Sequence, residues 1–157
     1  MHDLARQILS AFRAKNWTVT TAESCTGGMV AAAITEIPGS SDVFDRGYIT
    51  YSNTAKMEML DVALTTLNDF GAVSEQVAQE MAQAALVAAK TDIAISVTGI
   101  AGPGPSEYKP EGRVCFGLAQ KSKVTLTTTV EFGAIGRSNV RSKATKFALN
   151  LILNAAK

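Results

Sequence analysis

The stretch TDIAISVTGI, residues 91–100, is an almost unbroken run of apolar residues in the middle of the chain. A strand of this composition is expected to be buried on both faces, like a central strand of an α/β sheet. Helical patterns at residues 3–15 and 74–90 precede it, and β-branched segments lie on either side. Strands that alternate with helices predict a three-layer α/β/α sandwich, and a hairpin after residue 112 predicts a mixed β-sheet.

The other elements follow from hydrophobic periodicity and from breaker residues. The expected strands are residues 17–23, 43–52, 113–120 and 124–132. The expected helices are residues 29–37, 54–62 and about 138–154, with Ser74 capping the helix at 74–90 and Ser52 or Asn53 capping the helix at 54–62. Residues 64–73 are expected to form a connector with one helical turn.

Length and composition limit the possible classes. A chain of 157 residues that is 46% hydrophobic is expected to form a single domain, residues 1–157, with a real core. It contains no apolar run of about 20 residues, and its start lacks the apolar region of a secretory signal, so we expect a cytoplasmic protein without a membrane partner. A net charge of +1 gives no sign of nucleic-acid binding.

The chain has one histidine, His2, at its expected frayed start. A Ser-His-Asp triad, a Cys-His pair or a histidine-rich metal site is therefore excluded unless His2 folds back into a cleft. The cysteines, Cys25 and Cys115, form no C-x-x-C pair, which argues against zinc-ribbon and thioredoxin-like sites. We expect no metal and no cofactor.

Three unusual junctions are expected to follow strands: SCTGG (residues 24–28), YSNTAK (residues 51–56) and TGIAGPGP (residues 98–105). Ligands of open α/β sheets bind beyond the carboxyl ends of the strands. Three such junctions at one edge of the sheet are more than packing requires, and they predict a site there.

SCTGG has two interpretations. Ser24 or Thr26 would cap the following helix, and the glycines would allow close packing against the sheet. Alternatively, Ser24 is a nucleophile beside backbone amides that stabilise an oxyanion. A serine needs a base, and Lys56 is the candidate because burial favours the neutral form of an amine. Tyr51 is placed to pass protons or to orient that lysine.

Each of these residues also has a structural interpretation. Lys56 would otherwise be a surface helix residue, and Tyr51 a packing aromatic. Cys25 is the rival nucleophile, although a buried structural thiol is the more common situation for such a residue.

The runs TAESCTGG, YSNTAK, GAVSEQVAQEMA and SVTGIAGPGP, in this order, resemble the C-terminal domain family of CinA over essentially the whole chain. Stand-alone members of the PncC type are nicotinamide-nucleotide amidases, which convert nicotinamide mononucleotide to nicotinic acid mononucleotide and ammonia in pyridine-nucleotide salvage. The resemblance implies the same amidohydrolase reaction here, by a Ser-Lys mechanism without metal.

Carried over residue by residue, the resemblance makes Ser24 the nucleophile, Lys56 the base and Tyr51 their assistant. It implies that the substrate contacts two loops and one arginine: Thr26, Gly27, Gly28, Thr98, Gly99, Gly102 and Arg137. Arg137 would hold the substrate phosphate. Glu23 also matches, with the orientation of loop amides as its simplest role.

Two departures from the family pattern keep alternatives open. The loop reads GPSEYKPEG at residues 104–112, and Ile-Gly-Arg at residues 135–137 replaces the usual Gly-Asp-Arg. The domain could therefore be a nucleotide-binding or regulatory module with altered catalysis, or an amidase for another small carboxamide. A homodimer is expected only because small α/β enzymes with apolar helices are often dimers. No residue supports a link to competence or DNA damage.

Overall fold

The computed structural model describes residues 1–106 and 108–157; Glu107, inside the GPSEYKPEG segment, lies outside the described residues. The helices are α1 (His2–Lys15), α2 (Met29–Thr35), α3 (Asn53–Leu60), α4 (Leu64–Phe70), α5 (Glu75–Ala89) and α6 (Arg137–Ala155), with a 3₁₀ turn at Ser40–Asp42. The strands are β1 (Val19–Glu23), β2 (Phe44–Ile49), β3 (Ile93–Gly99), β4 (Arg113–Gln120) and β5 (Leu126–Glu131).

The strands form one five-stranded sheet in the order β2-β1-β3-β4-β5. β1 pairs in parallel with β2 on one side and with β3 on the other. β4 pairs antiparallel with both β3 and β5. The mixed sheet predicted from the sequence is therefore confirmed, and β3 is buried along almost its whole length, as its composition indicates.

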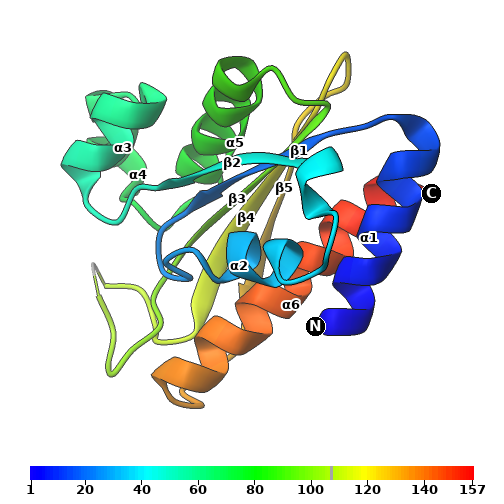
Figure 1. Ribbon diagram of the computed structural model, residues 1–157. Coiled ribbons are helices and arrows are strands. Elements are labelled where there is room, and N and C mark those ends of the chain that lie inside the picture. Colours follow the sequence, from blue (N-terminus) through cyan, green and yellow to red (C-terminus); the bar gives the residue numbers. More distant parts are fainter. Residues whose placement is uncertain (107) are drawn as a thin grey trace.

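Helices cover both faces of the sheet. In Figure 1, α5 lies on one side of the strands with α3 and α4, while α1, α2 and α6 lie on the other side. The core divides in the same way, with a larger cluster around Phe12, Phe116 and Leu149 and a smaller one around Leu60 and Met81. The predicted three-layer α/β/α sandwich is confirmed.

The largest difference from the sequence prediction is α4, a helix of seven residues where a connector with one turn was expected. The start of α4 is fixed by a residue that is distant in the sequence. The Glu80 carboxylate on α5 accepts hydrogen bonds from the Ala63 amide, 2.8 Å, and from the Thr66 hydroxyl, 2.5 Å. Leu67 then packs into the smaller cluster. Local sequence cannot reveal a partner 14 or 17 residues away.

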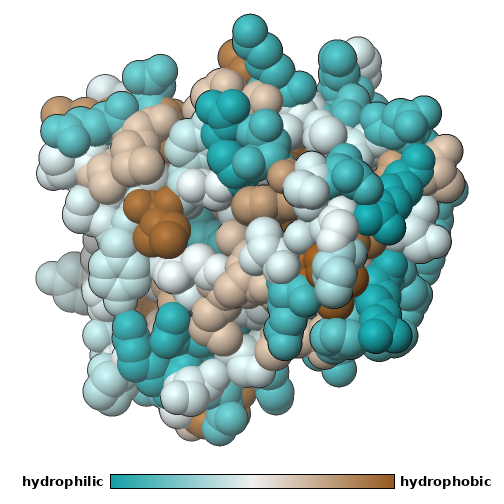
Figure 2. Space-filling view, viewed as in Figure 1, coloured by the Kyte–Doolittle hydropathy of each residue, from teal (hydrophilic) through white to brown (hydrophobic). Residues whose placement is uncertain are grey.

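β2 is shorter than predicted and lies at the edge of the sheet, with most of its residues exposed or half-buried. Ser52, the first of the two predicted caps, accepts a bond from the Ala55 amide, so α3 begins directly after it. The face in Figure 2 carries separate hydrophobic residues among polar ones and no continuous apolar surface.

Candidate active site

Ser24 and Lys56 meet where the parallel strands end. Glu23, the last residue of β1, pairs with Ile49 of β2 and with Val97 of β3. The segments that leave these strands therefore start side by side. Ser24 begins one of them, and its own amide donates a 2.9 Å hydrogen bond to the Val97 carbonyl.

The Lys56 amine lies within hydrogen-bond distance of the Ser24 hydroxyl. Nζ is 3.2 Å from Ser24 Oγ and donates a second bond, 2.9 Å, to the Thr50 carbonyl. Ser24 is 8% exposed and Lys56 only 1% exposed, so both groups are largely removed from water. The cap at Ser52 fixes the start of α3, which directs the side chain one turn later toward the sheet edge.

This pair lies in a pocket of about 280 Å³. The pocket is lined by most of the residues that the sequence singled out: Ser24, Tyr51, Lys56, Thr98, Gly99, Gly102 and Arg137. It is also lined by residues to which the sequence assigned no role in the site, among them Asn53, Val73 and Ser106.

The structure does not bring Thr26, Gly27 or Gly28 into the lining of this pocket. Thr26 is fully buried, Gly27 lies against Arg141, and a Cβ on Gly28 would meet Ile49 of β2. The glycine pair serves the turn, since both glycines have positive φ, 57° and 97°. None of the three residues lines this pocket, so their predicted contact with the substrate stays a prediction.

The Glu23 side chain provides the hydrogen-bond acceptors for backbone amides in the first turn of α2. Its carboxylate oxygens accept hydrogen bonds from the amides of Val30, 2.9 Å, and Ala31, 3.0 Å. Neither Ser24 nor Thr26 caps this helix, contrary to one interpretation of SCTGG. A buried carboxylate that accepts amide bonds at a helix start is well placed, because that end carries partial positive charge. The amides of Val30 and Ala31 are thus not available to a substrate.

Arg141 on α6 is a residue that sequence reasoning missed. Its Nε donates to the Cys25 carbonyl and its Nη2 to the Thr26 carbonyl, both at 3.1 Å. The Gly27 amide closes the same turn by donating to the Ser24 carbonyl, 3.0 Å. The segment after Ser24 is therefore held by a charged group from the opposite end of the chain, a contact that spacing alone does not signal.

Arg137 and Tyr51 meet at the mouth of the pocket. Arg137 Nη2 donates to the Tyr51 hydroxyl, 2.8 Å, and Nη1 donates to the Gly102 carbonyl, 2.9 Å. Tyr51 is 59% exposed, so it stands at the rim and not beside the buried amine. Arg137 links the segment after β2 to the loop after β3.

The residues after β3 have packing roles besides lining the pocket. Thr98 donates a 2.8 Å hydrogen bond to the Ala72 carbonyl. A Cβ on Gly99 would lie 2.7 Å from Val114 Cγ2, so a side chain there would clash with β4. Gly102 has φ 87°, and its missing Cβ leaves room for the Glu111 carboxylate.

Cys25 is a poor nucleophile in this setting. It lines the pocket but is only 5% exposed. Burial, which penalises the charged thiolate, raises the pKa of the Cys25 thiol to about 12. The reactive form of cysteine is the thiolate, so the raised pKa disfavours Cys25 as the nucleophile.

Within residues 1–106 and 108–157, no cluster of three or more His, Cys, Asp or Glu side chains is placed to hold a metal ion. In the same part of the chain, every helix is too short or too polar to span a bilayer. His2 is exposed at the start of α1.

Comparison with known proteins identifies the family. The profile described as the CinA C-terminal domain matches residues 1–156. The chain belongs to the CinA C-terminal domain family. It is 53% identical over 154 residues to the nicotinamide-nucleotide amidohydrolase PncC of Enterobacter agglomerans, covering 98% of this chain and 93% of that protein. The protein of the same name from Escherichia coli K12 is 50% identical over 150 residues, or 95% of this chain and 90% of that protein.

The family is also represented among solved structures. The competence/damage inducible protein CihA from Agrobacterium tumefaciens superposes with a TM-score of 0.96 at 44% identity, covering 99% of this chain and 95% of that one. Longer family relatives exist, and the chain spans 36% of one from Caldicellulosiruptor saccharolyticus. The resemblance stated from the motifs is therefore confirmed.

Proposed function

We propose that this CinA-family domain hydrolyses the carboxamide of nicotinamide mononucleotide, giving nicotinic acid mononucleotide and ammonia. The single observation that carries the proposal is the buried contact of 3.2 Å between Ser24 Oγ and Lys56 Nζ inside a pocket. The names of the relatives from E. agglomerans and E. coli, nicotinamide-nucleotide amidohydrolase, supply the substrate class.

Lys56 is the proposed base. A serine hydroxyl reacts only when a neighbouring group accepts its proton. Burial penalises the ammonium form of a lysine, and the Thr50 carbonyl keeps the amine directed at Ser24. A neutral Lys56 accepts the proton as Ser24 Oγ attacks the carboxamide carbon.

The remaining steps return every proton. Lys56 delivers the proton to the amide nitrogen, and the C–N bond breaks. Ammonia departs, and the acyl group remains as an ester on Ser24 Oγ. Water then attacks the ester and gives its proton to Lys56, which returns it to Ser24 Oγ as the carboxylic acid product departs. Tyr51, at the rim, orients the substrate in this scheme.

We assign the oxyanion to the turn that Arg141 holds. The proposed donors are backbone amides of that turn, at Cys25, which lines the pocket, and at Thr26 next to it, because Glu23 occupies the amides of Val30 and Ala31. Donors that are fixed before the reaction stabilise developing charge most effectively.

Arg137 is the proposed phosphate contact. A guanidinium has five N–H donors, and its bonds to Tyr51 and Gly102 engage one N–H on each of Nη2 and Nη1. The other N–H groups can donate to a phosphate at the mouth of the pocket, which would explain a preference for the nucleotide over free nicotinamide.

The test is ammonia release by the purified protein without added metal, measured side by side with nicotinamide, its riboside and its mononucleotide. We expect turnover with the mononucleotide and much less with the other two. Tight binding of the mononucleotide without ammonia would instead support a regulatory module. Faster turnover of an unphosphorylated carboxamide would support a different amidase.

The cellular setting follows from the reaction. The product would feed pyridine-nucleotide salvage, and a cytoplasmic location fits such a substrate. A homodimer stays a prediction from base rate, and sedimentation velocity would test it, since a monomer peak across the working concentration range would exclude it.

A further inference from the structure

Two segments that lie far apart in the sequence both contribute to the pocket wall. The connector between α4 and α5 contributes Ala72 and Val73, and the loop after β3 contributes residues 102–106. The width of the pocket therefore depends on what holds this loop against the connector.

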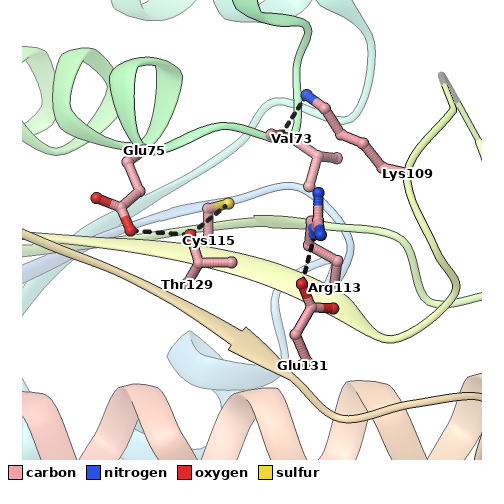
Figure 3. A network of polar contacts seen from close by, with 7 residues as sticks. All are labelled: Val73, Glu75, Lys109, Arg113, Cys115, Thr129 and Glu131. Carbon is pink, nitrogen blue, oxygen red and sulfur yellow. Dashed lines mark hydrogen bonds and ion pairs between the residues drawn. The ribbon is translucent and has the colours of Figure 1, made fainter.

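Lys109 makes that attachment. From the loop, its Nζ donates to the Phe70 carbonyl, 2.5 Å, and to the Val73 carbonyl, 2.6 Å. Figure 3 shows the side chain reaching across to Val73. Hydrogen bonds from a charged donor are shorter and stronger than neutral ones, so one residue fixes both ends of the turn that carries Ala72.

Hydrogen bonds within the loop link the pocket-lining residues Gly104 and Ser106 to Lys109 and Glu111. The Glu111 carboxylate accepts a 2.7 Å bond from the Gly104 amide. Ser106 and Lys109 exchange backbone bonds of 3.1 and 2.8 Å. These contacts connect the pocket wall at Gly104 and Ser106 to the residue that grips the connector.

The base of the loop is held separately. Gly112 donates to the Ile100 carbonyl, 2.8 Å, and Arg113 pairs with Glu131 across β4 and β5, 2.6 Å (Figure 3). Loss of the Lys109 bonds would therefore release the tip of the loop while its base stays in the sheet.

We propose that Lys109 is a positioning residue that sets the width of the substrate pocket. This inference rests on the proposed function. Lys109 acts through the backbone of the connector, because its Nζ donates to the carbonyls of Phe70 and Val73. Its loss should weaken substrate binding and selectivity and leave the chemical step almost unchanged.

The experiment compares Lys109→Met, which keeps the aliphatic stem, with Lys123→Met in the hairpin at the opposite end of β4. For Lys109→Met we expect KM for nicotinamide mononucleotide to rise about tenfold with kcat within about threefold, the pattern of lost uniform binding. The preference for mononucleotide over riboside should fall in parallel. Lys123→Met should match the wild type, and Lys109→Arg, which keeps charged donors, should lie between the wild type and Lys109→Met.

Amide hydrogen exchange of residues 101–112 in the substrate-free protein is the second readout. Lys109→Met should raise exchange at Gly104 and Ser106 about tenfold or more. Unchanged exchange, unchanged KM, or a fall in kcat at constant KM would each overturn the proposal. If the wild type released no ammonia from any carboxamide, the proposed function would fail, while exchange and binding of the mononucleotide would still decide the role of Lys109.

Discussion

At the scale of single residues, the account depends on a lysine that is 1% exposed and whose amine lies 3.2 Å from a serine hydroxyl. Replacement of Lys56 by Met keeps the stem and removes the base. We expect kcat for ammonia release to fall by about 10³-fold or more, with folding retained because Met suits a buried position. Lys90→Met, on an exposed helix end, is the matched control; comparable losses in both variants would contradict a specific role for Lys56.

Cys25 lies next to Ser24, but we expect its replacement to leave activity almost unchanged, in contrast to replacement of Lys56. With a pKa of about 12, only about 10⁻⁴ of the thiol is ionised at pH 8. Cys25→Ala should keep kcat within about threefold, since the thiol takes no part in the chemistry. Native protein should react slowly with a thiol reagent at that pH. A dead Cys25→Ala variant that is correctly folded would transfer the role of nucleophile to the cysteine.

The residues that could be predicted from the sequence are those with a local reason. Ser24 directly follows β1, Lys56 lies one turn into the capped helix α3, and Thr98 lies near the end of β3. Their place at one sheet edge follows from the parallel pairing of β1 with β2 and β3. Arg141 could not be predicted, because its bond to the Cys25 carbonyl spans 116 residues. Gly27 and Gly28 have positive φ and shape the turn, and they do not line the pocket, which the sequence alone did not indicate.

At the scale of elements, the turn after Ser24 is held by α6. Arg141→Met removes the donors to Cys25 and Thr26 and frees the turn. Misplacement by about 1 Å can cost about 10²-fold in rate, so we expect kcat to fall by roughly 10- to 100-fold with little change in KM. Steady-state kinetics beside Lys143→Met, an exposed residue on the same helix, would test this; a change confined to KM would argue against the assignment.

The same scale explains which element boundaries were predictable. The caps at Ser52 and Ser74 are local, and α3 and α5 begin directly after them as expected. The starts of α2 and α4 depend instead on Glu23 and Glu80, whose carboxylates come from other elements. Partners of this kind are invisible to periodicity and propensity, which is why α4 was expected only as a turn.

At the scale of the whole molecule, stability and catalysis are separated along the sheet. Phe12 is fully buried and contacts Trp17 edge to face at 6.0 Å. Its carbonyl accepts a hydrogen bond from the Trp17 amide just before β1 begins, whereas the pocket lies where β1 ends. Phe12→Ala should lower the free energy of unfolding by about 3–5 kcal/mol, measured by urea denaturation. The folded fraction of this variant should retain the wild-type KM. A change in KM larger than about threefold would show that the Phe12 cluster and the pocket are energetically coupled, which would contradict their separation.

The central claim is that Ser24 attacks the carboxamide. The most direct measurement is the rate of ammonia release from saturating nicotinamide mononucleotide by Ser24→Ala, beside the wild type. Loss of the catalytic serine costs about 2 × 10⁶-fold in kcat in a well-studied serine protease, and here we predict a fall of at least about 10³-fold. A Ser24→Ala protein that is folded and releases ammonia within about tenfold of the wild-type rate would contradict the account.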